Sequence, residues 1–431
     1  MADPTSPSRS DIVWISTLAA LVALRILIPL VVLAAAPARV SPLPDYTYTP
    51  LNGDAAGFYQ GAVNLLVASD VVLASWIGVA AVAMTLLFGA ASVLLWRADV
   101  RWLAGLLPAL ALSLVLGLLA NEMASPSAAV IGWPIVWAAA LLPLHLLHIG
   151  ITPDRAFSLG LGLSLIANAT TVVATALIGL RATGRRSIGL IAAALYATWP
   201  IWVGFVAGAQ AWQNGQWRVD VGLHLYDEPV STALVVVSLV LLLHPRLTAM
   251  SAAIAGLLIG FATAVKLTNG PLAVGLVVVV AFGFGVRRAA VFALGGMVSL
   301  PIVLGFWSKG YADASGGERI DLGALYQLRF ILPNVRTSTI FTTWMLLLLL
   351  PLAALGCAKV TGWYRRALLI APIVVTIACY APYYVTNQHP RFYYVILPAV
   401  FVLQAAGTVL VWDAGCRGLH SRARAVPDAS A

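Results

Sequence analysis

Long runs of apolar residues, separated by short polar connections, make up most of this chain. The runs that carry no charge, or almost none, are 12–36, 72–96, 102–120, 156–180, 187–208, 229–243, 247–265, 270–286, 289–306, 339–357, 367–385 and 392–412. A run of ~20 apolar residues spans a bilayer, and it must be helical because its backbone groups find no water there. The pattern predicts an all-α fold, a polytopic membrane bundle of about 12–13 transmembrane helices, formed as one integral domain over residues 1–431.

The segment 131–150 is difficult to count as a membrane crossing. It is apolar, but it contains Trp133, Trp137 and two prolines, which suit the headgroup region or a bent helix. Counting it as a crossing would move Arg185 and Arg186 to the opposite side of the membrane from the other basic turns. We interpret it as an amphipathic or re-entrant helix on the outer face, with a thirteenth crossing as the alternative.

The composition agrees with a membrane protein. Hydrophobic residues make up 61% of the 431 positions and charged residues 10%, whereas a soluble protein has about 25% charged residues. The first apolar run lacks a convincing cleavage site, so we expect it to stay attached as a helix. The three cysteines form no disulfide framework and no metal-binding spacing.

The position of the basic residues explains the net charge of +9. Cytoplasmic loops of membrane proteins collect Lys and Arg, and one threading with both termini in the cytoplasm places most basic residues inside. These include Arg97, Arg101, Arg181, Arg185, Arg186, Arg287, Arg288, Arg365 and Arg366. The charge is therefore a topogenic signal and does not indicate a nucleic-acid partner. In this threading the long connections 37–71, 121–155, 209–228 and 307–338 all lie outside, where we expect the functional site.

The first candidate residues are an acid and a cation near the N-terminus. Asp54, in Asn52-Gly53-Asp54, is suited to act as a base toward a hydroxyl group, although the same residues also suit an ordinary helix start. Asp45 and Asp70 are the competing acids. Arg25 lies near the middle of the first helix, where a charge is costly and usually faces the bundle interior or a wet cavity.

Three later motifs add charged and aromatic side chains on the same outer face. Tyr226-Asp227-Glu228-Pro229 suits either helix initiation or hydrogen bonding to sugar hydroxyls. Lys266, between two apolar helices, suits either a snorkelling lysine or a phosphate ligand. Asn387-Gln388-His389-Pro390-Arg391-Phe392 places Arg391 before the last helix, as an interfacial anchor or a second phosphate ligand.

His145 and His148 lack a third metal ligand, so we predict neither a metal nor a cofactor, and no nucleotide-binding or serine-hydrolase motif is present.

The order of these motifs resembles the GT-C superfamily of integral membrane glycosyltransferases. The resemblance covers nearly the whole chain: Arg25, Asp54, the Tyr226–Pro229 helix start, the Lys266–Pro271 stretch and the segment from His389 to Pro398. This sequence departs from the family pattern after Asp54, because many members carry a second acid nearby and this chain has Ala55. The hairpin 72–120 also departs from the expected pattern.

The resemblance implies a polyprenyl-phosphate sugar as donor and a cell-envelope glycolipid, glycan or protein as acceptor. In this hypothesis Asp54 deprotonates the acceptor in an inverting reaction, and Lys266, Arg391 and Arg25 bind the donor phosphate. The side chains that would contact the sugar or acceptor are Tyr226, Asp227, Glu228, His389, Trp212 and Trp217. A lone carboxylate favours a metal-independent reaction. The resemblance is to mannosyl- and arabinosyltransferases of the actinobacterial type, which implies mannose or arabinose as the sugar.

Two other functions remain open from the sequence. A lipid-linked oligosaccharide ligase or polymerase would use arginines in an outer loop, and the loop 307–338 contains Lys309, Arg319, Arg329 and Arg336. A lipid flippase or transporter without covalent chemistry would carry several mid-membrane charges and symmetric halves. The sequence has one central charge, Arg25, and no internal repeat.

Overall fold

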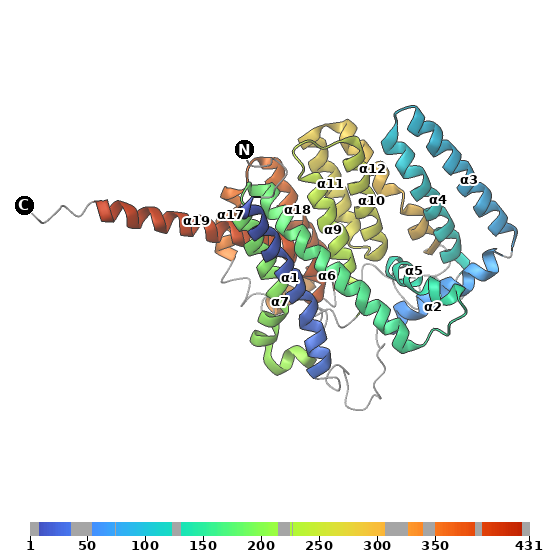
Figure 1. Ribbon diagram of the computed structural model, residues 1–431, viewed down its shortest axis with the longest axis horizontal. Helices are drawn as coiled ribbons and strands as arrows, with labels where there is room; N and C mark the ends of the chain where they lie inside the picture. Colours follow the sequence, from blue (N-terminus) through green and yellow to red (C-terminus); the bar gives the residue numbers. More distant parts are fainter. Residues whose placement is uncertain are drawn as a thin grey trace, which may run out of the picture.

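The computed structural model describes residues 8–35, 54–73, 75–122, 131–213, 225, 227–306, 326–338, 350–383 and 390–424. These ranges contain fifteen α-helices and two short 3-10 helices. Within them the only extended pairing is an isolated bridge between Tyr326 and Tyr383. The predicted all-α fold is confirmed (Figure 1).

The helices follow the predicted apolar runs closely. Their bounds are α1 Arg9–Ala35, α2 Asp54–Leu73, α3 Trp76–Arg97, α4 Arg101–Glu122, α5 Gly132–Leu146, α6 Pro153–Thr183, α7 Arg186–Gln213, α9 Glu228–Leu242, α10 Ala249–Val265, α11 Asn269–Phe284, α12 Val286–Met297, α15 Ile331–Ser338, α17 Leu350–Lys359, α18 Trp363–Tyr380 and α19 Leu397–Arg424. The 3-10 helices are η2 Leu328–Phe330 and η4 Pro390–Ile396.

Several of these helices have the length and composition of membrane spans. Seven segments of 18 residues or more are apolar enough to cross a bilayer, and four shorter apolar helices accompany them. The longest span is α6, whose N-cap Thr152 accepts a hydrogen bond from the Arg155 amide and whose C-cap Gly184 adopts a φ of 75°. The chain is a multi-pass membrane protein.

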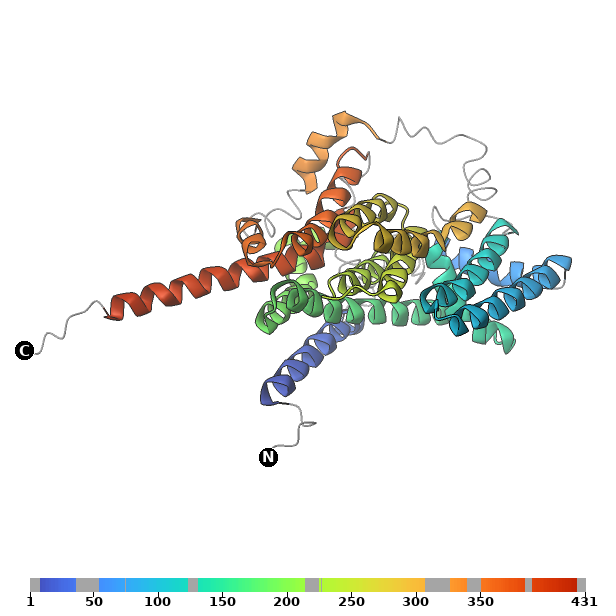
Figure 2. The same cartoon turned by 90° about the horizontal axis from the view of Figure 1, so that it is seen from above.

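Neighbouring helices form antiparallel hairpins that pack into one bundle. The connections between α3 and α4, α6 and α7, α9 and α10, α11 and α12, and α17 and α18 are all short, and the helices within each of the first four pairs contact one another. The helix α6 contacts α1, α7 and α9, and α19 contacts α17 and α7. Figure 1 and the view turned by 90° in Figure 2 show α9 to α12 side by side.

Hydrogen bonds and ion pairs gather the hairpin turns at one end of the bundle, here called the basic end. Arg186 pairs with Asp11 at the start of α1, and Arg185 and Lys359 both pair with Asp413 of α19 at 2.8 and 3.1 Å. Tyr364 donates a hydrogen bond to the Leu242 carbonyl at 3.3 Å, which joins the start of α18 to the end of α9. These contacts bring the basic turn between α6 and α7 and the end of α17 together with the starts of α1 and α18 and with α19.

The opposite end of the bundle, here called the lysine end, carries the turn 266–268 between α10 and α11. The Trp133 indole donates to the Leu225 carbonyl at 2.8 Å, just before α9, and the Trp137 indole donates to the Ala156 carbonyl at 3.0 Å in the first turn of α6. A Cβ at Gly132 would collide with the backbone of Val265, the last residue of α10. The helix α5 therefore packs at the lysine end, against the starts of α6 and α9 and the end of α10.

The helix α2 occupies the second half of the predicted connection 37–71. It begins at Asp54, as the helix-start interpretation of Asn52-Gly53-Asp54 predicts, and it packs against α5. On its surface Asp70 lies 3.0 Å from the His145 ring. The part of this connection before residue 54 lies outside the described residues.

Candidate functional site

The turn between α10 and α11 holds a buried lysine. The helix α10 ends at Val265, and Lys266 adopts an extended backbone (φ −149°, ψ 106°) while its amide still donates to the Ala262 carbonyl. Leaving the helical conformation at this point turns the side chain of Lys266 toward α9. Only 8% of Lys266 is exposed, so the predicted alternative of a lysine that snorkels to water is wrong.

The start of α9 supplies the carboxylates that compensate Lys266. Its ammonium donates a 2.8 Å hydrogen bond to Glu228 Oε1, and its Nζ lies 3.8 Å from Asp227 Oδ1. Pro229 in the first turn is compatible with a helix start because it needs no amide partner there. The predicted helix start is confirmed, and it places both acids against the lysine.

The charge of Lys266 is fixed by these neighbours. Burial alone lowers the pKa of the Lys266 ammonium, but the carboxylates of Asp227 and Glu228 outweigh it and raise that pKa above its ordinary value. The lysine therefore stays protonated, as it would need to be to attract an anion.

A narrow polar crevice surrounds this cluster. It is lined by residues of α9, α11, α18 and η4, together with Lys266 and Thr268. The Asn269 amide donates to Ser231 Oγ at 2.7 Å and to the Ala262 carbonyl at 2.9 Å. Within the described part of the chain, the fully buried hydroxyl of Thr232 has no hydrogen-bond partner. A buried hydroxyl in this state costs about 1–3 kcal/mol.

The 3-10 helix η4 covers one side of the crevice. Lys266 Nζ lies 5.2 Å from the centroid of the Phe392 ring, and this ring stacks on Tyr380 at 4.8 Å with nearly parallel planes. The Tyr380 hydroxyl in turn lies 2.5 Å from Thr268 Oγ1. The backbone of Arg391 belongs to η4, next to Phe392, but its side chain is outside the described residues.

Arg25 forms a second buried cluster. The residue is 0% exposed, as predicted for a central charge that faces the interior. Its guanidinium donates to Asn168 Oδ1 from Nη2 at 2.7 Å and from Nε at 3.2 Å, and Nη2 also donates to the Tyr394 hydroxyl at 2.7 Å. The guanidinium carbon lies 5.2 Å from the centroid of the Tyr196 ring.

The described partners of Arg25 also bond to one another. The hydroxyls of Tyr196 and Tyr394 are 2.9 Å apart, and each lies within 3.1 Å of Asn168 Oδ1. This network joins α1, α6 and α7 to η4. Since η4 carries both Tyr394 and Phe392, the same short helix contacts the Arg25 cluster and the Lys266 cluster.

Several candidate residues lie wholly or partly outside the described part of the chain. Tyr226, Trp217 and His389 are not described at all. The backbones of Asp54, Trp212 and Arg391 are placed in α2, α7 and η4, without their side chains. The structure brings Lys266, Asp227 and Glu228 together and places Arg25 in a separate cluster that η4 connects to them.

Sequence reasoning missed the neutral partners of both cations. For Arg25 they are Asn168, Tyr196 and Tyr394, and for the crevice they are Ser231, Thr232 and Asn269. A signal was present for Asn168, because an amide in the middle of an apolar run needs a polar partner. The described ranges contain no group of three His, Cys, Asp or Glu side chains arranged to hold a metal ion.

No protein-family model matches the chain, and no curated protein matches it.

Proposed function

We propose that the chain is a membrane glycosyltransferase that moves a sugar from a polyprenyl-phosphate donor to a cell-envelope acceptor. The observation that carries this proposal is the buried Lys266–Glu228–Asp227 cluster beside η4, at one end of a bundle of apolar helices. A lipid-linked phosphate requires a cation at the edge of the membrane, and a sugar requires nearby hydrogen-bonding groups. Both kinds of group occur together in this crevice.

The charge distribution supports an extracytoplasmic site. Arg185, Arg186, Arg365 and Arg366 lie in or next to the turns gathered at the basic end, and Arg97, Arg101, Arg287 and Arg288 lie at the turns that the sequence assigns to the same side. Since cytoplasmic loops are rich in Lys and Arg, we assign the basic end and both termini to the cytoplasm. The lysine end, with the proposed site, then faces the extracytoplasmic side.

The proposed reaction is an inverting displacement. Asp54 removes the proton from an acceptor hydroxyl, whose oxygen attacks the anomeric carbon from the face opposite the phosphate. The bond from that carbon to the phosphate oxygen breaks, and its electron pair leaves with polyprenyl phosphate. Lys266 and Arg391 would stabilise the charge on this leaving group. The proton on Asp54 passes to water after the product departs.

The neighbours of Lys266 are compatible with this role. An ammonium has three donor hydrogens, and the contact with Glu228 Oε1 at 2.8 Å engages one of them. The two carboxylates hold the lysine charged and fixed, and Asp227, Glu228 and Thr232 would supply hydrogen-bonding groups to sugar hydroxyls. Arg25 supports the site from its own cluster, through Tyr394 and η4.

The test uses purified protein, membrane extract and a panel of radiolabelled polyprenyl-phosphate sugars. We expect one donor to be consumed, and Asp54→Asn to lower transfer by about 10²–10⁴-fold, the usual contribution of a general base. The matched control is Asp70→Asn, an acid on the same helix whose contact is with His145. Transfer at the parental rate by a folded Asp54→Asn protein refutes the base assignment, and the absence of transfer from every donor refutes the function.

A further inference from the structure

Five arginines gather where the end of α9 and the starts of α12 and α18 meet. One lies in the turn after α9, two lie in the first turn of α12, and two lie in the first turn of α18. We call this set the arginine patch, and its members are Arg246, Arg287, Arg288, Arg365 and Arg366. Three of them are exposed and two, Arg288 and Arg365, are half-buried.

Tyr364 holds these helix ends together. Its hydroxyl donates a hydrogen bond to the Leu242 carbonyl of α9 at 3.3 Å. Its ring packs edge-on against Phe284 of α11, with centroids 4.7 Å apart, and it fills the space that a Cβ on Gly283 would need. The helices α11 and α18 contact one another (Figure 1). Every arginine of the patch therefore lies within four residues of Tyr364 or of a residue that Tyr364 contacts.

The arginine patch lacks carboxylate partners. Among the described residues, no acid forms an ion pair with any of its members, whereas four basic residues at other turns do form such pairs, namely Arg101, Arg185, Arg186 and Lys359. The described hydrogen bonds of the patch guanidinium groups go to neutral oxygens, such as the Val360 carbonyl. The bias of basic residues toward one side of a membrane explains their presence. It does not explain why acids accompany them at the other turns and not here.

The starts of α12 and α18 add positive charge to the patch. Gly285 and Gly362 precede these helices with φ of 87° and 79°, and glycine has no side chain that could accept a hydrogen bond from the first amides. By contrast, Thr152 and Thr248 cap α6 and α10. A helix N-terminus carries a partial positive charge and unpaired amides, so two arginines beside it are unfavourable and an anion is favourable.

The surface around the patch is apolar. Phe282 and Val286, on either side of the α11–α12 turn, are both 78% exposed, and Trp363 at the start of α18 is 56% exposed. Tryptophan is typical of the headgroup layer of a bilayer. The patch therefore lies where charged headgroups and the first part of their hydrocarbon chains would contact the protein.

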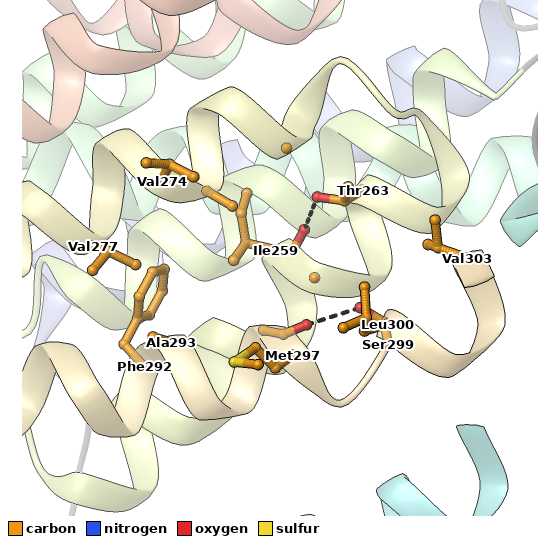
Figure 3. A pocket seen from close by; sticks show the side chains of 14 residues that line it. Ile259, Thr263, Val274, Val277, Phe292, Ala293, Met297, Ser299, Leu300 and Val303 are labelled. Atoms are coloured by element: carbon orange, nitrogen blue, oxygen red, sulfur yellow. Dashed lines mark hydrogen bonds between the residues drawn. The ribbon is translucent and has the colours of Figure 1, made fainter. Parts of the chain in front are cut away.

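Deeper in the membrane, α11 and α12 separate and leave an apolar groove of about 300 Å³. The wall residues nearest the patch are Val277 of α11 and Phe292 of α12 (Figure 3). Phe292 follows Arg288 by four residues, about one helical turn. A hydrocarbon chain can thus continue between the two helices while its headgroup remains beside the arginines.

We infer that the arginine patch binds the phosphate of an anionic phospholipid. The arginines and the two helix starts supply positive charge and amide donors, and guanidinium groups bind phosphate oxygens in pairs. A zwitterionic lipid would bring its own cation into the patch and binds more weakly. The bound headgroup links α9, α12 and α18. This inference does not depend on any reaction at the lysine end, nor on which leaflet the basic end faces, because both leaflets present phosphates.

The experiment is a lipid titration of the full-length protein in a neutral detergent, followed by native mass spectrometry. The probes are phosphatidylglycerol, which is anionic, and phosphatidylcholine, which is zwitterionic. We expect phosphatidylglycerol to bind more tightly. Replacing both arginines of α12, Arg287→Gln with Arg288→Gln, should lower its affinity about tenfold, equivalent to about 1.4 kcal/mol, and leave phosphatidylcholine binding unchanged.

The matched control is Arg97→Gln with Arg101→Gln, which removes the same charge from the α3–α4 turn. Arg365→Gln with Arg366→Gln gives a second test on α18. Equal affinity for the two lipids overturns the inference, and so does an equal loss of phosphatidylglycerol affinity in the control variant. Displacement of phosphatidylglycerol by an equal concentration of inorganic phosphate would show that the patch takes a soluble anion, and it also overturns the inference.

Discussion

The two buried cations of this protein have different described partners. Lys266 is surrounded by the carboxylates of Asp227 and Glu228, whereas the described partners of Arg25 are the Asn168 amide and the Tyr394 hydroxyl. A carboxylate that loses a cation carries a buried charge, whereas an amide or hydroxyl that loses one gives up only hydrogen bonds. The Lys266 cluster is therefore expected to depend more strongly on its central residue.

The largest effect is expected from Lys266→Met. The substitution removes the described cation from two buried carboxylates, so the free energy of unfolding should fall by about 3–5 kcal/mol. Chemical denaturation in detergent micelles, followed by tryptophan fluorescence, measures the change. A Lys266→Met protein as stable as the parent would show that the carboxylates are not charged in the folded protein.

The double variant Lys266→Met with Glu228→Gln sharpens this result. Removing both charges should cost less than the sum of the two single substitutions, with a coupling energy of about 0.5–3 kcal/mol. The same denaturation measurement on the four proteins of the cycle gives the coupling. Simple additivity would contradict the 2.8 Å contact between Lys266 and Glu228.

A smaller effect is expected from Arg25→Met. Asn168 Oδ1 still accepts hydrogen bonds from Tyr196 and Tyr394 in this variant, so the loss of stability should be about 1–3 kcal/mol. The comparison between the clusters fails if Arg25→Met is more destabilising than Lys266→Met under the same conditions.

Tyr394→Phe should have a still smaller effect. It removes one hydroxyl from the Arg25 network and retains the ring, with an expected loss of about 1 kcal/mol. In the proposed enzyme the same change loosens η4 and should raise the KM for the donor more than it lowers kcat. Tyr393→Phe is the control for the loss of a tyrosine hydroxyl from the same 3-10 helix.

The smallest effect is expected at the exposed pair of His145 and Asp70. The Asp70 side chain is 64% exposed, so Asp70→Asn should change the free energy of unfolding by no more than about 1 kcal/mol. A larger loss in the denaturation assay would show that the contact between α2 and α5 depends on this pair.

The sequence predicts the helices of this protein better than the contacts between them. Apolar runs and the Glu228-Pro229 start give the correct elements, because these signals are local. The interior position of Arg25 also follows from the cost of a central charge. The contacts of Arg25 with Asn168 and Tyr394 span 143 and 369 residues. They depend on which helix faces meet, and a single sequence without repeats does not specify this.

The lysine crevice is partly predictable from the sequence. Lys266 and Glu228 are 38 residues apart, and the α9–α10 hairpin brings the end of α10 beside the start of α9. A hairpin of this kind is predictable from two adjacent apolar runs, but the rotation that turns Lys266 inward is not. The sequence therefore identifies the charged residues of the crevice and misses Ser231, Thr232 and Asn269.

The position of η4 near the end of the chain has a consequence for biogenesis. Phe392 and Tyr394 are synthesised long after Arg25 and Lys266, because they lie in η4, just before α19. Both buried cations are therefore synthesised before the ring and the hydroxyl that contact them. The surroundings of the two cations are completed only when η4 has been synthesised.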